Sequence, residues 1–268
     1  ILVYWFVILT LRTKVSVTSV SDSNEKLTLK TDTAHYSLIA FFSALIFVAH
    51  PIQTQAVTYI WQRVTSLATF FYLLSIVMYI NFRIKQSAIS LQPSAVVSQG
   101  FQIFKLNAKS YMLYAASILS AILAMFTKEI SFTLPLMIAL YEFLFFEGKI
   151  KKRILYLIPL LVTMLIIPLH RVSVASIADI NEATKEFTTI SRWDYLFTQF
   201  RVIATYLRLL FFPINQNLDY DYPVYYSFSN PNVFLSFVFL VSIICLAVYL
   251  LCKSRTSAVR RFTHSPIH

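Results

Sequence analysis

The chain has 268 residues, of which 57% are hydrophobic, 16% aromatic and 13% charged; the charged fraction is about half of that in an ordinary soluble domain. The formal charge is +11, but the basic residues stand between long apolar runs, so they indicate membrane topology rather than a nucleic-acid-binding face. The presence of only two glycines, Gly100 and Gly148, excludes glycine-rich nucleotide-binding loops, which need several glycines close together.

Seven apolar stretches are predicted to cross a membrane. A crossing helix needs roughly 20 apolar residues, and four stretches meet this requirement clearly: 64–82, 110–127, 130–147 and 233–252. Three more are short or interrupted: 1–11, 36–49 and 154–169. The predicted fold is therefore all-α, a polytopic helical membrane protein whose transmembrane region covers 1–252. Because the chain begins at Ile1 inside an apolar run, we expect this region to be truncated at its N-terminus.

Lysine and arginine residues gather in four segments, which the positive-inside rule places in the cytoplasm. These segments are 12–30, 83–109, 147–153 and the basic tail 253–268. Alternation then assigns to the outer side, the periplasm of a bacterium, the segments 50–63, 128–129 and 170–232.

The outer segment 170–232 contains a predicted interfacial helix at 195–213. Its polar residues recur at steps of three and four, so they share one face, opposite an apolar face. The polar set is Asp194, Thr198, Arg201, Thr205 and Arg208. This pattern favours a helix that lies on the outer membrane surface. The alternative is a crossing helix whose arginines face the interior of the bundle.

Polar residues on the outer side are the candidates for a site. His50 precedes Pro51, which is well placed to start a helix, and we expect that helix to run unbroken to Phe82. Its polar stripe contains Gln55, Thr58, Gln62, Thr65 and Thr69, a pattern that fits helix packing or a substrate groove. The Arg63 side chain either pairs with a lipid phosphate or extends to the membrane surface without a specific ligand.

Three further charged positions each have two interpretations. Lys128 and Glu129 form a predicted two-residue turn between spans, which is either solvated or faces an outer cavity where Lys128 binds phosphate. Glu142 lies inside an apolar stretch; it marks an intramembrane site or lies at the interface.

Asp219 and Asp221 form an Asp-x-Asp pair, which can hold a metal-phosphate complex or simply belong to a turn. His264 and His268 have the spacing of a helical metal pair, but they lie in the predicted tail. We therefore predict no metal site and no cofactor.

Three strings carry a resemblance to a known family: AHPIQTQAVTYIWQR, FTKEISFTLPLMIALYEFLFF and TQFRVIATYLRLLFFPINQNLDYDYP. They resemble the membrane region of bacterial proteins that continue into tetratricopeptide repeats. Those proteins are in turn similar to the transmembrane O-mannosyltransferases with tetratricopeptide repeats, which have the GT-C architecture. No tetratricopeptide period is visible after Cys252.

The resemblance implies a glycosyltransferase that takes a sugar from a polyprenyl-phosphate donor and transfers it to a protein or glycan acceptor on the periplasmic side. The implied location is the bacterial inner membrane, or the endoplasmic reticulum membrane if the protein is eukaryotic, and nucleic acid is not an expected partner. Such enzymes usually carry their acidic base in the first outer loop, so we expect the catalytic base to lie upstream of Ile1. The residues expected around the donor phosphate are His50, Arg63, Lys128, Arg201 and Arg208. Those expected on the acceptor side are Asp219, Asp221 and Glu129.

Two other function classes stay open at this point. A membrane transporter usually has helices broken by glycine or proline and several intramembrane charges. A non-catalytic membrane anchor for tetratricopeptide repeats is the other alternative.

Overall fold

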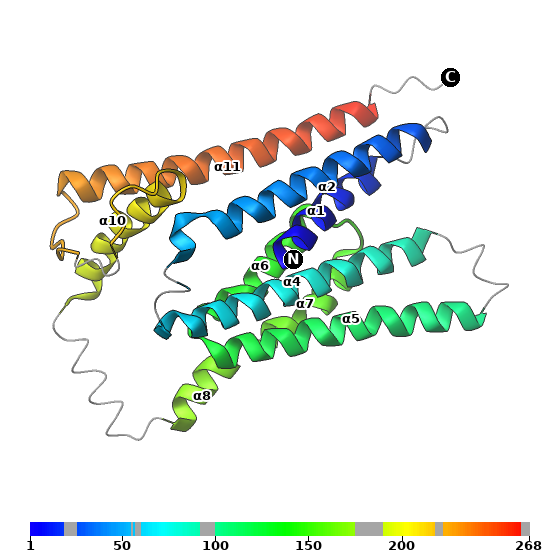
Figure 1. Ribbon diagram of the computed structural model, residues 1–268, viewed down its shortest axis with the longest axis horizontal. Helices are drawn as coiled ribbons and strands as arrows, with labels where there is room; N and C mark the ends of the chain where they lie inside the picture. Colours follow the sequence, from blue (N-terminus) through cyan, green and yellow to red (C-terminus); the bar gives the residue numbers. More distant parts are fainter. Residues whose placement is uncertain are drawn as a thin grey trace. The chain divides into compact units, whose positions relative to one another are not determined.

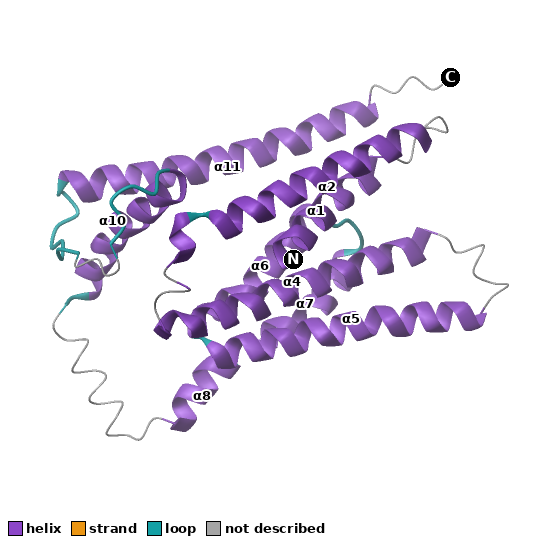
Figure 2. Ribbon diagram, in the orientation of Figure 1, coloured by secondary structure: helices purple, strands orange, loops and turns teal. Residues whose placement is uncertain are grey.

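The computed structural model describes residues 1–18, 26–54, 56, 60–91, 100–174, 190–217 and 222–263. In this part of the chain all elements are helical and there is no β-strand, which confirms the predicted all-α fold (Figure 1, Figure 2). The chain divides into two compact units, Ile1–Ala175 and Ser176–His268. Each unit is described by itself below.

The first unit contains the α-helices α1 (Leu2–Thr18), α2 (Lys26–Ala49), α4 (Arg63–Leu91), α5 (Gly100–Thr127), α6 (Leu134–Phe145), α7 (Ile150–Thr163) and α8 (Ile166–Val174). Short 3-10 helices in the described residues between them are η1 (Pro51–Gln53), η2 (Ile60–Gln62) and η3 (Glu129–Thr133). The second unit contains α10 (Arg192–Phe211) and α11 (Pro231–Thr263).

Within the described residues, four helical stretches are long and apolar enough to cross a membrane: Arg63–Ala88, Ala108–Thr127, Ile150–His170 and Pro231–Lys253. Two shorter apolar helices, Leu2–Thr13 and Ala34–Ala49, fall below that length. The four stretches are of the kind found in membrane proteins, as the composition indicated.

Proline explains why the apolar segments differ from those expected. The stretch 130–147, predicted as a clear crossing, is divided between η3 and the 12-residue α6; Pro135 has no N–H to donate to the carbonyl of Ser131, four residues earlier. The stretch 154–169 was expected to be short. It lies instead within Ile150–His170, with a turn at residues 164–165, where Pro168 cannot bond the carbonyl of Met164.

The expected continuous helix from Pro51 to Phe82 is wrong. Pro51 does start a helical turn, as predicted, but η1 and η2 are 3-10 turns and α4 begins only at Arg63. The same helix then continues past Phe82 to Leu91. The 3-10 bonding pattern is usual in short pieces at helix ends.

Small polar residues allow α4 and α5 to pack closely along their length (Figure 1). Ser75 Oγ donates to the carbonyl oxygen of Ser117 at 2.9 Å, and Ser117 Oγ donates to the carbonyl oxygen of Ser75 at 2.9 Å. Both serines are fully buried, as are Ala121 and Ala124 one and two turns further along α5. Small residues and interhelical hydrogen bonds of this kind hold helices together where hydrocarbon surrounds them.

Large apolar side chains cover much of the outer surface of both units. On α2 they include Phe41, Phe42 and Ile46, which is 65% exposed. All residues of α11 from 241 to 250 are exposed. Apolar surface of this extent is unfavourable in water, whereas a hydrocarbon environment accommodates it.

In the described part of the second unit the first helix is α10, which matches the predicted helix 195–213 closely. Ser191 accepts a hydrogen bond from the backbone N–H of Trp193 at 3.4 Å and so caps the helix. Asp194 lies in the first turn and Arg208 in the last, and each charge interacts favourably with the helix dipole at its end of the helix. On the polar face Thr198 and Thr205 are buried, whereas Arg208 is exposed. On the apolar face Leu196, Ile203 and Leu210 are exposed, so the interfacial placement stays a prediction.

Replacing Ser117 with leucine is expected to destabilise the first unit, because no space exists between α4 and α5 for the larger side chain. Overpacking costs roughly 1–3 kcal/mol, and each lost interhelical hydrogen bond adds about 0.6 kcal/mol. The check is the midpoint of unfolding of the full chain in micelles. The matched control is Ala115→Leu, since Ala115 is exposed on the same helix. Equal destabilisation by both substitutions would contradict the packing role of Ser117.

Candidate functional site

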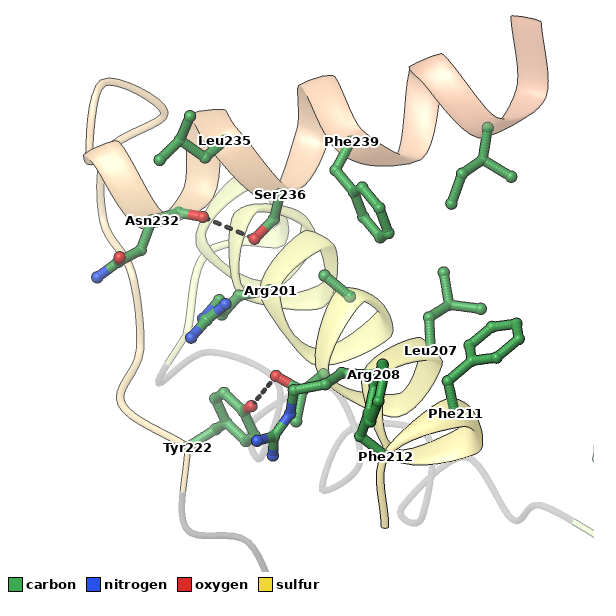
Figure 3. Close-up of a pocket in the computed structure, with 13 residues that line it drawn as sticks. Arg201, Leu207, Arg208, Phe211, Phe212, Tyr222, Asn232, Leu235, Ser236 and Phe239 are labelled. Atoms are coloured by element: carbon green, nitrogen blue, oxygen red, sulfur yellow. Dashed lines mark hydrogen bonds between the residues drawn. The ribbon is translucent and has the colours of Figure 1, made fainter. Parts of the chain in front are cut away.

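A pocket of about 670 Å³ lies between α10 and α11 in the second unit (Figure 3). Pockets that hold small molecules and cofactors commonly have volumes of 300–1,000 Å³. Its walls come from α10, from α11 and from Phe212 and Tyr222 in the segment between them. The lining residues are Arg201, Ala204, Thr205, Leu207, Arg208, Phe211, Phe212, Tyr222, Asn232, Leu235, Ser236, Phe239 and Ile243.

Two arginines give the pocket its charge. Arg201 and Arg208 are seven residues apart, which is two helical turns or about 10.5 Å of rise, so both lie on one face of α10. Figure 3 shows their guanidinium groups on the same side as the Tyr222 ring. No aspartate or glutamate is among the described residues that line this pocket. Within the described lining, the two guanidinium groups therefore give the pocket a positive charge.

Hydroxyl groups join α10 to the segment that precedes α11. Tyr222 Oη is hydrogen-bonded to Thr205 Oγ1, which lies between the two arginines along the helix. About two turns earlier, Thr198 Oγ1 accepts a hydrogen bond from the backbone N–H of Tyr225 at 3.1 Å. These bonds explain why the threonines of the polar face are buried.

The opposite part of the pocket is apolar. Leu207, Phe211 and Phe239 lie away from the guanidinium groups in Figure 3, and Leu235 and Ile243 also contribute to the lining. A pocket with cations at one part and aromatic and aliphatic groups at the other is suited to an amphiphile with an anionic head. Guanidinium groups bind phosphate well because their N–H groups match pairs of phosphate oxygens.

The structure brings together Arg201 and Arg208 but gives His50 a different position, in the first unit. Its Nδ1 accepts a hydrogen bond from the backbone N–H of Ile52 at 3.2 Å. The extended backbone at His50 starts η1, with Pro51 as its first residue. This contact caps the short helix η1, so the position of the His50 side chain is explained without invoking a ligand.

Lys128 reaches the start of α4. Its Nζ donates to Thr65 Oγ1, and Thr65 Oγ1 donates to Gln62 Oε1 at 2.7 Å. Lys128 thus lies close to two residues of the predicted polar stripe, and Arg63, which follows Gln62, is exposed there. The expected two-residue turn is an extended Lys128 followed by η3, in which the exposed Glu129 occupies the first turn.

Several other predicted positions lie outside the described residues. They include both acceptor-side aspartates, Asp219 and Asp221, two members of the polar stripe, Gln55 and Thr58, and the spaced pair His264 and His268. Among the residues that are described, no group of three His, Cys, Asp or Glu residues could hold a metal ion.

A buried ion cluster in the first unit was not expected from the sequence. The carboxylate of Glu142 on α6 is fully buried and pairs with Arg83 of α4 through two bonds, Nε to Oε2 at 2.8 Å and Nη2 to Oε1 at 2.7 Å. Tyr79 Oη donates to Oε2 at 3.1 Å. Arg153 of α7 donates from Nη2 to the backbone carbonyl of Glu142 at 2.6 Å. Three helices meet at this one residue.

Aromatic rings surround the two guanidinium groups. That of Arg83 lies 4.9 Å from the ring centre of Phe146 and 5.2 Å from that of Tyr156. That of Arg153 lies 4.6 Å from the ring centre of Phe143. Cation–π contacts are strongest where water is excluded. The enclosure therefore stabilises charges that would otherwise be costly to bury.

The sequence contained part of the signal for this cluster. Glu142 is the one charge inside an apolar stretch, and such a residue needs a cation from a neighbouring helix. Arg83 and Arg153 were interpreted as loop charges because each stands beside a run of basic residues. Only the packing of α4, α6 and α7 identifies them as the partners of Glu142.

Comparisons of this chain with protein-family models, with curated proteins and with solved structures found no match.

Substitutions of the ion pair are expected to be strongly coupled. Glu142→Gln leaves the two guanidinium groups without their carboxylate, and breaking a buried pair from one side costs roughly 3–5 kcal/mol. Combining it with Arg83→Met should cost less than the sum of the two single changes, because no new unpaired charge is added. The four free energies of unfolding in a double-mutant cycle measure this coupling.

The control for the cycle is Glu147→Gln, since Glu147 is an exposed carboxylate five residues further along the chain. Exposed charges of this kind usually contribute less than about 1 kcal/mol. Additive effects of the Arg83 and Glu142 substitutions would contradict the cluster.

Proposed function

We propose that this chain is a glycosyltransferase-like membrane protein that binds a polyprenyl-phosphate sugar donor in the α10–α11 pocket. The observation that carries the proposal is the pairing of Arg201 and Arg208 with an apolar wall in one pocket. A polyprenyl phosphate has the matching chemistry, since it joins an anionic phosphate to a long apolar chain. The sequence resemblance points to the same ligand class.

The arrangement of charges suits the leaving group of a sugar transfer. In such a reaction the bond between the anomeric carbon and the phosphate oxygen breaks, and the acceptor hydroxyl oxygen bonds to that carbon. The hydroxyl proton passes to a carboxylate base, and the departing phosphate gains negative charge. Fixed guanidinium groups stabilise that charge in a site of low water content. Arg201 and Arg208 are assigned this role.

The proposal assigns the remaining residues to supporting roles. Tyr222 lines the pocket and follows Asp221 directly in the sequence, which keeps Asp219 and Asp221 as acceptor-side candidates, with Glu129. His50, Arg63 and Lys128 stay candidates for donor binding through the resemblance alone. The catalytic base is proposed to lie upstream of Ile1, as in the GT-C enzymes that the sequence resembles.

The proposed topology adds three crossings, by α1, α2 and α6, to the four helical stretches of spanning length, for a total of seven. The pocket then faces the periplasmic side of a bacterial inner membrane, with α10 at the membrane surface. The exposed apolar face of α10, which includes Leu196, Ile203 and Leu210, supports this placement because it offers hydrocarbon contacts. The acceptor is a protein or glycan on that side.

Arg201→Ala and Arg208→Ala are each expected to weaken binding of a polyprenyl phosphate roughly 10- to 150-fold, because each removes a hydrogen bond to a charged group worth about 1.5–3 kcal/mol. The double substitution should reduce binding further. Titration of the full chain in micelles with the lipid, followed by native mass spectrometry, measures this affinity.

The matched control is Arg192→Ala, because Arg192 is an exposed arginine at the start of the same helix and does not line the pocket. Loss of binding in this variant equal to that in Arg201→Ala would refute a specific phosphate site.

Sugar transfer itself is tested with a radiolabelled polyprenyl-phosphate sugar and a protein extended upstream to include the first outer loop. We expect label to pass from the lipid to an acceptor, and the Arg201→Ala and Arg208→Ala double variant to lose this activity. Lipid-linked sugar that crosses vesicle membranes without covalent transfer would favour a transporter. Binding without either transfer or flux would favour an inert membrane anchor.

A further inference from the structure

The buried ion cluster contains one more cation than it has carboxylates to balance. Both oxygens of Glu142 are engaged by Arg83, and Oε2 also accepts the bond from Tyr79. Arg153 Nε lies 3.3 Å from Oε1, within ion-pair range but without hydrogen-bond geometry. The Arg153 side chain is only 12% exposed. One positive charge is therefore largely buried with incomplete compensation, which is unfavourable.

The surrounding side chains add positive charge rather than offsetting it. Lys149, Lys151 and Lys152 are exposed just before Arg153 in the chain. Lys85 on α4 and Lys109 on α5 belong to the same end of the first unit, where Gln86 Nε2 donates to Ser110 Oγ at 3.3 Å. Among the residues whose side chains are described, the carboxylates near this end are the buried Glu142 and the exposed Glu147.

Apolar side chains continue directly from the lysines along α7. Ile150, Ile154 and Leu155 are 63%, 45% and 63% exposed, and they belong to the stretch Ile150–His170, which is apolar and long enough to cross a membrane. Cations at the end of such a helix, followed by an exposed apolar face, match a phospholipid headgroup with its acyl chains beside it.

We propose that the lysines at the start of α7, together with Arg153, bind the phosphate of an anionic phospholipid in the membrane leaflet at that end of the bundle. The lipid phosphate supplies the negative charge that Glu142 alone does not supply to two arginines. The site is separate from the α10–α11 pocket in the second unit, and it does not depend on the sugar donor.

The test uses the full chain in which Arg201→Ala and Arg208→Ala remove the other anion-binding candidates. This protein is placed in phosphatidylcholine, with or without phosphatidylglycerol, and the retained lipids are identified by native mass spectrometry. We expect phosphatidylglycerol to be retained and to raise the midpoint of unfolding, because a ligand that binds only the folded state stabilises it. Added salt should weaken the effect at the exposed lysines.

Exchanging Lys149, Lys151 and Lys152 for glutamine should reduce phosphatidylglycerol affinity by at least roughly tenfold, since each lysine near a charged membrane surface is worth about a fivefold change. Exchanging the same three residues for arginine keeps the charge and should preserve the binding. Lys253→Gln, on α11 of the second unit, should also leave the binding unchanged.

Arg153→Met gives an independent readout of the excess charge. In phosphatidylcholine alone, its midpoint of unfolding should fall, because the bond from Arg153 to the Glu142 carbonyl oxygen is lost, and the increase caused by phosphatidylglycerol should shrink as well. Equal retention of phosphatidylcholine and phosphatidylglycerol would overturn the proposal. Equal stabilisation by free inorganic phosphate would also overturn it, because the ligand would then not need to be a lipid.

Discussion

A carboxylate that is buried among apolar helices must be matched by cations from the protein, and the first unit depends on this constraint. Glu142 is fully buried on α6, and its partners come from α4 and α7. The single residue therefore fixes the rotation of three helices relative to one another. Lipid-facing apolar contacts cannot do this, because hydrocarbon accepts an isoleucine in many orientations, whereas a bidentate ion pair requires one.

Close packing of α4 and α5 holds Arg83 in the position that the ion pair needs. Ser75 and Ser117 bond to each other's backbone, and alanines extend the contact along α5. Small residues bring the helix axes together along this contact, while Tyr79 and Phe82 of α4 are buried and many other large apolar residues lie on the outside. Exposed apolar surface of this extent is unfavourable in water and suits hydrocarbon surroundings.

The second unit uses its charges differently. Arg201 and Arg208 lie on the same face of α10, and the described residues that line the α10–α11 pocket include no carboxylate. The threonines between and before them bind the segment that leads into α11. Through these bonds, Tyr222 and Tyr225 are held against α10, on the side of the pocket that Tyr222 lines. Arg83, by contrast, is engaged by the buried carboxylate of Glu142.

Much of this architecture follows from local sequence alone. Apolar runs of sufficient length predict the helices, and the three- and four-residue spacing in α10 places Arg201 and Arg208 on one face, because helical periodicity is a local property. The breaks before Pro135 and Pro168 were missed although the cause, an absent N–H, is also local. The partners of Glu142 could not be derived, since Arg83 is 59 residues away and resembles a loop cation in the sequence. Pairing between distant residues depends on how the helices pack, and that became clear only from the folded chain.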